Sequence, residues 1–269
     1  MFDDPNLVSC AGLVPVLALA LAEQTGLSEF RLGQTRIRSA RVNPAGKLSS
    51  VVAGMCAGAV SIADLEVIRA GGTARLFGGV YASATMGQLL REFSHGHSSQ
   101  LASVARAHLL ALVERTGCLA GIQTQAYVDI DSLLRPVSGH AKQGASFGHA
   151  KIAGRQVLCR GLSPLATTIS TDSGAPVIAG IRLGAGRAGS GKGAASMERE
   201  AIRTTRAAGA TGAILARGDS AYGSAAVIGV ALRESAQFSR CWRRTQPCWG
   251  DRQHRRAGLE PGALPRRGL

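Results

Sequence analysis

Two short apolar runs, each ending on an aspartate followed by a serine, constrain this chain most. Residues 127–132 read Tyr-Val-Asp-Ile-Asp-Ser, and residues 214–220 read Ile-Leu-Ala-Arg-Gly-Asp-Ser. Apolar runs of this kind predict buried strands, and the ends of strands in α/β folds form the rim at which ligands and metals bind. We therefore expect Asp131 and Asp219 to converge on one divalent metal ion, in a site of the kind that cuts and joins phosphodiester bonds.

The first part of the chain, residues 1–118, is expected to be helical. Its clearest helix spans 101–113, where apolar residues keep i, i+3, i+4 spacing and Gly117 follows as a stop. His108 lies on this apolar face and is interpreted as a core histidine, while His95 and His97, expected between two helices, do not specify a metal site. The other expected helices are 7–22, 44–58 with Asn43 as cap, 61–70 opened by Ser61 with Asp64, and one beyond a capping-box pair of Thr85 and Gln88.

From about residue 122 the pattern changes to strands. A run of strands followed by alternating helices and strands predicts a mixed α/β sheet, which we assign to residues 119–238. The expected strands are 124–131, 147–153, 156–160, 164–170, 176–183 and 212–217, and the expected helices are 195–208 and 222–236.

Composition narrows the partners and the compartment. The net charge of +14 attracts polyanions, of which nucleic acid is the commonest, although the predominance of Arg over Lys also fits a GC-rich coding sequence. Six cysteines without pairing or metal-ligand spacing favour a reduced cytoplasm. The apolar stretch 7–22 follows Asp3 and Asp4 and is short for a membrane span, so we interpret it as a buried helix and expect no membrane association.

Residues 239–269 differ abruptly from the rest. They hold both tryptophans, eight arginines, three of the nine prolines and no Val, Ile, Phe or Met. One interpretation is a disordered basic tail that embraces nucleic acid. The other is out-of-frame translation of GC-rich DNA, which we favour because the helix expected at 222–236 leads towards a strand that this segment does not supply.

Several separate motifs, in order along residues 3–238, resemble bacterial insertion-sequence transposases of the DDE type, and more narrowly their actinobacterial group. The resemblance implies a helical N-terminal region followed by a ribonuclease-H-like core, which is incomplete in this C-terminally truncated or frameshifted copy. It also implies DNA transposition, with Mg²⁺ or Mn²⁺ as cofactor, terminal repeats and target DNA as partners, a homodimer as the acting form, and a place at the nucleoid. The matching stretches are 3–9 (DPNLVS after Asp3), 87–93 (GQLLREF), 128–134 (VDIDSLL), 139–149 (GHAKQGASFGH) and 217–222 (RGDSAY).

Carried over to this chain, the family's first two carboxylates are Asp131 and Asp219. Asp129 lies two residues earlier on the same strand face and is a possible substitute or helper. The family's third carboxylate, a glutamate on a downstream helix, has no counterpart, because Glu260 precedes a proline and Glu234 follows Asp219 too closely. We therefore expect this copy to cleave DNA poorly or not at all, and the alternative is a non-catalytic DNA-binding remnant.

Two basic segments complete the expected site. Residues 186–193 match the phosphate-binding spacing G-x-x-x-x-G-K, but Gly193 stands where that motif needs Ser or Thr to ligate Mg²⁺, so a nucleotide-binding protein is the less favoured alternative. Arg187 and Lys192 are instead expected to meet DNA phosphates or to form a plain solvated loop. The segment 140–149, with Lys142, Lys151 and Arg155, is expected either to contact DNA or to form a hairpin with solvated charges.

Overall fold

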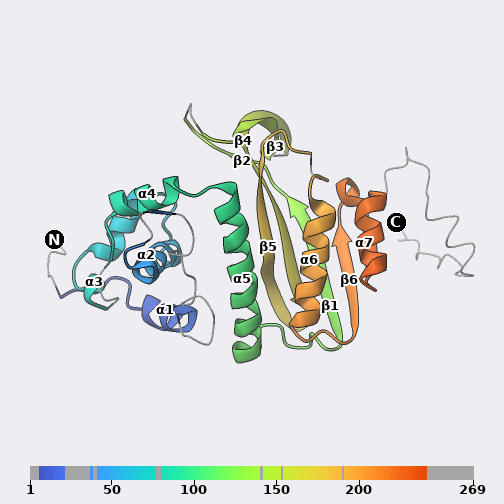
Figure 1. Cartoon of the computed structure of the whole chain (residues 1–269), viewed down its shortest axis with the longest axis horizontal. Helices are drawn as coiled ribbons and strands as arrows, with labels where there is room; N and C mark the ends of the chain where they lie inside the picture. The colour runs from blue at the N-terminus through green and yellow to red at the C-terminus, as the bar shows by residue number, and fades with distance from the viewer. Residues whose placement is uncertain are drawn as a thin grey trace, which may run out of the picture.

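The protein has a mixed α/β fold in which one seven-stranded sheet is joined to a group of helices. The computed structural model describes residues 6–21, 37–38, 41–76, 80–139, 142–152, 154–189 and 191–240, of which 21, 45, 74, 76, 151 and 152 are described by their backbone only. Figure 1 shows α1–α4 grouped on one side of α5, and α5, α6 and α7 lying along one face of the sheet. In these ranges no helix combines the length and the apolar character that crossing a bilayer requires.

The N-terminal region is helical, as expected, and α2 starts at Pro44 as predicted, whereas several other helices start at other residues than the sequence signals suggested. Asn43 caps α2, with its side-chain oxygen accepting from the Gly46 N–H at 3.0 Å. The segment opened by Asp64 is a 3-10 helix, with that carboxylate accepting from the N–H groups of Val60 and Ser61. The elements are α1 Leu13–Leu21, α2 Pro44–Cys56, η4 Ala63–Arg69, α3 Thr73–Leu76, α4 Ser83–Arg91 and α5 His95–Thr116.

The capping-box prediction for Thr85 and Gln88 is wrong, because α4 begins two residues earlier, at Ser83. The first N–H of this helix is satisfied from another element: the Glu66 carboxylate of η4 accepts from the Ser83 N–H at 3.0 Å. That hydrogen bond holds the pKa of Glu66 at about 2, well below its ordinary value. A long-range carboxylate thus replaces the local cap that the sequence pattern indicated.

Helix α5 begins at His95, so the two histidines expected between helices lie in its first turn. The Nδ1 atom of His97 accepts from the Ser94 N–H at 3.0 Å and lies 3.1 Å from the Ser94 hydroxyl, which forms a capping box with a histidine in place of the usual Glu or Gln. The helix ends at Gly117, which has a left-handed φ of 62°, as the sequence indicated.

Helix α5 belongs to two hydrophobic clusters. Its first half places Leu101 and Val104 against the N-terminal cluster of Ile37, Leu65, Met86 and Leu89. Its second half places Leu109 and Val113 in the larger cluster beneath the sheet. The helical region and the sheet therefore share one 22-residue helix.

The sheet has its first strand at the centre. Strand β1 pairs antiparallel with β4 on one side and parallel with β6 on the other; β5 extends the sheet beyond β4, and β7 extends it beyond β6. The bounds are β1 Gln125–Ser132, β2 Arg135–Pro136, β3 Ser146–Ile152, β4 Arg155–Thr171, β5 Gly174–Ala185, α6 Ala194–Ala207, β6 Ala213–Gly218, η5 Ser220–Tyr222, α7 Ala225–Arg233 and β7 Gln237–Arg240.

Strand β4 unites two strands that the sequence predicted separately, 156–160 and 164–170. Gly161 and Pro164 suggested a break between them. Along one edge of β4, however, β2 pairs as far as Leu162 and β1 begins only at Leu165, so Pro164 falls in the gap between two partners. A proline can occupy a strand there without removing a hydrogen bond of either pairing.

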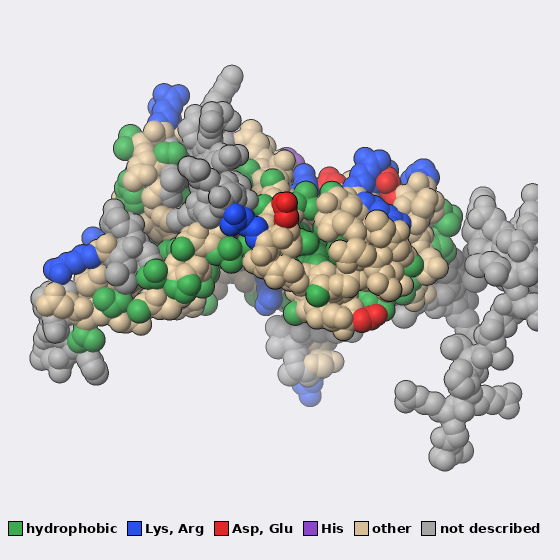
Figure 2. Space-filling view, turned by 90° about the horizontal axis from the view of Figure 1, so that it is seen from below, with side chains coloured by type: hydrophobic (Ala, Val, Ile, Leu, Met, Phe, Trp, Pro, Cys, Tyr) green, Lys and Arg blue, Asp and Glu red, His purple; other side chains and the backbone are tan. Residues whose placement is uncertain are grey.

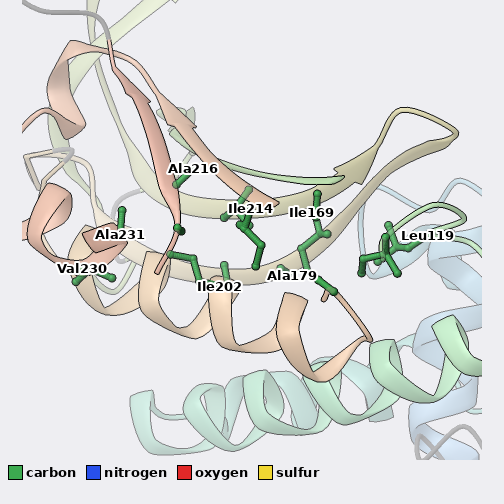
Figure 3. Packing of buried hydrophobic residues seen from close by; sticks show 14 of the residues in the cluster. Leu119, Ile169, Ala179, Ile202, Ile214, Ala216, Val230 and Ala231 are labelled. Carbon is green, nitrogen blue, oxygen red and sulfur yellow. The ribbon is translucent and has the colours of Figure 1, made fainter. Parts of the chain in front are cut away.

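The main core lies between the sheet and α5, α6 and α7. Ile202 of α6 packs against Ile214 and Ala216 of β6, and Val230 of α7 closes the same cluster (Figure 3). These side chains are at most 2% exposed, and burial of each large aliphatic side chain contributes about 1.5–3 kcal/mol to stability.

The chain reaches a final strand that the sequence interpretation had not expected. Strand β7 pairs parallel with β6, and its last residue, Arg240, forms an ion pair with Glu198 of α6. Both side chains are buried, at 2% and 0% exposure. The sheet therefore continues two residues past the boundary that composition suggested at 238, and residues 241–269 lie outside the described part of the chain.

Candidate carboxylate site and basic pocket

Asp131 and Asp219 lie side by side at the carboxyl edge of two adjacent parallel strands. The β1–β6 pairing ends with Ile130 opposite Gly218; Asp131 is the next residue of β1, and Asp219 directly follows the end of β6. Both side chains are exposed. Ligands of open α/β sheets bind outside the carboxyl ends of the strands, so the geometry places the two predicted carboxylates where such a site is expected.

Short local hydrogen bonds fix both carboxylates. One oxygen of Asp131 accepts from the Ser132 N–H at 2.7 Å. One oxygen of Asp219 accepts from the Ala221 N–H at 2.8 Å and caps η5. Within the described ranges, the second oxygen of each carboxylate makes no hydrogen bond, so both are available to an incoming ligand.

Asp129 is engaged differently, although it lies on the same face of β1. Its two oxygens accept from Nε and Nη2 of Arg217 at 2.7 and 2.8 Å. The guanidinium also lies 4.4 Å from the ring centroid of Tyr127, whose hydroxyl donates to Asp172 at 2.9 Å. Hydrogen bonding to Asp129 raises the pKa of Arg217. Both oxygens of Asp129 are thus engaged by Arg217 in this structure, and neither is available to a ligand.

A buried ion pair lies behind the two aspartates, on the helix-covered side of the sheet. Arg240 and Glu198 were not predicted as part of the site. Gly218 leaves room for the Arg240 side chain, because a Cβ at this position would lie 2.9 Å from Arg240 Nη1. Burial lowers the pKa of Arg240, and burial likewise raises the pKa of Glu198, so desolvation outweighs the attraction between them in both groups. The charges of Asp129 and Asp219 also act on Arg240, in the opposite direction.

A third metal ligand is not found close to the pair. The described residues contain no group of three or more His, Cys, Asp and Glu side chains placed to hold a metal ion. Two carboxylates suit Mg²⁺, which keeps several waters and takes one or two protein carboxylates in many sites. The residues present therefore fit a single hydrated ion rather than a pair of ions.

The glycine-rich loop 186–193 lies between the end of β5 and the start of α6, and Arg187 and Lys192 are exposed on it. Both side chains line a pocket of about 700 Å³ that also includes Ser132, the residue after Asp131. At its first residue the loop packs closely against the β3 backbone: a Cβ on Gly186 would lie 2.2 Å from the Ser146 carbonyl oxygen. The structure therefore brings this predicted basic loop to the same end of the sheet as the carboxylate pair.

The other predicted basic residues lie on the β3–β4 hairpin. Arg155 begins β4, Lys142 precedes β3, and both side chains are exposed. Lys151 pairs with Gln156 in the hairpin, and its side chain lies outside the described ones. Figure 1 shows the hairpin extending beyond the end of the sheet at which β1 finishes. Figure 2, which views the opposite end, shows a largely uncharged surface, with scattered basic side chains and one group of them that is mixed with acidic side chains.

Comparison with known proteins found no match for this chain among protein-family models, curated proteins or solved structures. A functional assignment therefore depends on the residues and geometry of the site, since a fold alone does not define an activity.

Proposed function

We infer that the protein is a DNA transposase of the DDE type, with a ribonuclease-H-like core that binds one divalent metal ion and DNA. The observation that carries this proposal is the adjacency of Asp131 and Asp219 at the ends of the parallel strands β1 and β6. The central position of β1, between the antiparallel β4 and the parallel β6, supports it because the family's first carboxylate ends the first core strand. The net charge of +14 supports a nucleic-acid partner and a place at the nucleoid.

The chemistry expected at the site is hydrolysis of a phosphodiester bond followed by attack of the freed 3′-hydroxyl on target DNA. A bound Mg²⁺ or Mn²⁺ would supply charge stabilisation to a phosphoryl oxygen and acidify a coordinated water. Asp131 and Asp219 would hold the ion through their unengaged oxygens. Arg217 would keep Asp129 paired and so fix the strand face on which the two ligands stand.

Cleavage by this chain is proposed to be slow. The third carboxylate of the family has no counterpart among the described residues, and Glu234 is occupied by ion pairs with Arg203 and Arg199 at 2.8 and 3.9 Å. Losing a second metal ion removes several kcal/mol of transition-state stabilisation. A DNA-binding remnant without cleavage is the second candidate, and the same missing carboxylate favours it.

A nucleotide-hydrolysing protein is the third and least favoured candidate. Gly193 carries no hydroxyl for a metal ion and has a left-handed φ of 81°, which a Ser or Thr there would adopt only with strain.

Binding of Mn²⁺ to the full chain, followed by electron paramagnetic resonance, tests the proposal. Asp131→Asn and Asp219→Asn should each weaken binding at least 10-fold, because each removes one of two charged ligands, a change worth about 1.4 kcal/mol or more. Asp172→Asn is the matched control: it removes an acid from the turn between β4 and β5, at the opposite end of the sheet from the carboxylate pair, and it should leave binding unchanged. Equal affinity of the wild type and Asp131→Asn would refute a metal site at the pair.

A further inference from the structure

The pocket at the same end of the sheet as the carboxylate pair has a basic lining that suits an anion. It measures about 700 Å³, and its charged or titratable lining residues are Arg182, Arg187, Lys192 and His95. Ser132 and Ser163 also line it. None of the described residues that line it is acidic, although Arg182 lies 3.7 Å from the Glu200 carboxylate, so the net charge of the lining is positive.

Hydrogen bonds hold the pocket walls in position. Arg182 Nη1 donates to the Ser196 hydroxyl at 2.7 Å, and that hydroxyl donates to the Gly193 carbonyl oxygen at 2.9 Å. On the facing wall, the Arg187 N–H donates to the Ser146 hydroxyl at 2.8 Å. The arginine of β5 and the glycine-rich loop are therefore fixed before any ligand enters, which lowers the entropic cost of binding.

The chemistry of the walls suits a phosphate group. Guanidinium and ammonium groups make short, charge-assisted hydrogen bonds to phosphate oxygens. The start of the 14-residue helix α6, at Ala194, borders the same pocket through Gly193 and adds the partial positive charge of its N-terminus. The volume exceeds that of a single phosphate and falls in the range of sites that take drug-sized organic ligands.

The position of the pocket selects among phosphate-containing ligands. Ser132 lines it and directly follows Asp131 on β1, so the pocket and the carboxylate pair lie at the same end of the sheet, on alternate faces of that strand. A strand of DNA has its next phosphate one nucleotide away from any given phosphodiester bond. A strand lying at the two aspartates can therefore place a neighbouring phosphate in this pocket.

We propose that the pocket formed by Arg182, Arg187, Lys192 and the start of α6 binds a backbone phosphate of the DNA strand adjacent to the phosphodiester held at Asp131 and Asp219. The proposal rests on the function inferred above. In this proposal the segment 186–193, whose sequence nearly matches a nucleotide-binding loop, binds a phosphate of a polynucleotide instead of a nucleotide. His95, from the first turn of α5, adds a contact from the helical region to the same strand.

The test uses the full chain in EDTA and a 3′-labelled, 5′-phosphorylated single-stranded trinucleotide followed by fluorescence anisotropy. Arg187→Gln and Lys192→Gln should each weaken binding about 5- to 10-fold, as expected for the loss of one charge-assisted contact. Arg233→Gln, which removes an exposed arginine at the end of α7, is the matched control and should change affinity less than about 2-fold. The proposal is overturned if Arg187→Gln and Lys192→Gln behave like Arg233→Gln.

Competition identifies the source of the phosphate. Unlabelled trinucleotide should displace labelled trinucleotide at lower concentration than ATP or inorganic triphosphate does. If ATP binds more tightly and the trinucleotide fails to displace it, the pocket is a nucleotide site and the assignment to a DNA strand is wrong.

The Mn²⁺ measurement separates the two proposals. If Asp131→Asn abolishes Mn²⁺ binding while Arg187→Gln leaves trinucleotide binding intact, the metal site stands and the phosphate pocket falls. If Arg187→Gln weakens trinucleotide binding while Asp131→Asn and Asp219→Asn retain Mn²⁺, the phosphate pocket stands and the transposase assignment falls.

Discussion

The two faces of the sheet are built from alternate residues of the same strands, yet they differ in almost every physical respect. On the face covered by α5, α6 and α7, β1 contributes Ala126, Val128 and Ile130, which are at most 2% exposed. On the other face the intervening residues of β1 are Tyr127, Asp129 and Asp131, all of them partly or fully exposed. One face holds the fold together by apolar burial, and the other presents charged groups to solvent.

The comparison shows that, within one eight-residue strand, the side chains that stabilise the fold and those of the candidate site lie on opposite faces. On the covered face side chains are closely packed, so a change in side-chain volume lowers the free energy of unfolding. On the open face side chains interact through charges and hydrogen bonds, and water screens these interactions. The buried ion pair of Glu198 and Arg240 is the exception, since it places charge on the covered side. Substitutions on the two faces should therefore give effects of different size and kind.

The largest effect is expected from that exception. Arg240→Ala leaves Glu198 buried without its partner and should lower the free energy of unfolding by about 3–5 kcal/mol. The measurement is urea denaturation followed by circular dichroism at pH 7. The double variant Glu198→Leu with Arg240→Met should recover most of the loss, because apolar pairs of similar volume often replace a buried ion pair without cost. A single-variant loss below about 1 kcal/mol would show that the pair is not buried in solution.

A second large effect is expected from apolar packing on the same face. Ile202→Ala removes a fully buried side chain from the cluster between α6 and β6 and should cost about 2–5 kcal/mol. Ile178→Ala is the matched control, since Ile178 is 59% exposed on β5 and its truncation should cost less than about 1 kcal/mol. Similar losses for the two variants would mean that the exposed face of β5 is covered in solution.

The dependence of stability on pH should also come from the covered face. The pKa of Glu198 is raised by burial, so the folded protein binds this proton more tightly than the unfolded chain does. The contribution of Glu198 is therefore most favourable below the unfolded pKa of about 4.5 and is lost as pH rises through the folded value. Glu198→Gln should remove this part of the pH dependence in denaturation curves taken between pH 4 and 8, whereas an unchanged curve would contradict a raised pKa.

On the open face a smaller loss of stability should accompany a gain in metal affinity. Arg217→Ala breaks a half-exposed ion pair and a cation–π contact, and should cost about 1 kcal/mol. It also releases both oxygens of Asp129, two residues from Asp131, so Mn²⁺ should bind several-fold more tightly. Arg217→Lys keeps the charge and should give a smaller gain. Unchanged Mn²⁺ affinity in Arg217→Ala would show that Asp129 cannot reach the ion.

The smallest effect on stability is expected at the carboxylate pair itself. Asp131→Asn removes one of two adjacent negative charges that are exposed, so the free energy of unfolding should change by no more than about 0.5 kcal/mol, with a small increase favoured. The same variant should lose Mn²⁺ binding, so the effect on metal affinity is distinguished from the effect on stability. A large loss of stability would place Asp131 in the structural framework instead of the site.

The sequence predicted the parts of the fold that depend on local pattern. The apolar runs in 127–132 and 214–217 predicted both central strands, and the stop at Gly117 predicted the end of α5. The adjacency of Asp131 and Asp219 followed from a general property of strand ends, with no knowledge of register. These predictions needed only neighbours within a few residues.

The parts that sequence could not supply depend on pairing between distant residues. The contact of Asp129 with Arg217 spans 88 residues and requires the parallel register of β1 and β6. The cap of α4 comes from Glu66, 17 residues away, so the local pair Thr85 and Gln88 was misleading. The role of Arg240 was hidden because the composition around it changes abruptly, while its partner Glu198 lies 42 residues earlier.

The sharing of α5 between two hydrophobic clusters has a consequence for folding. Leu101 and Val104 stabilise one cluster and Leu109 and Val113 the other, so neither cluster is complete unless the whole helix is formed. Loss of the helix from either side exposes apolar surface on both, which couples their free energies of unfolding. The helical region and the sheet should therefore melt in a single cooperative transition, and a cut anywhere along α5 should release both halves together.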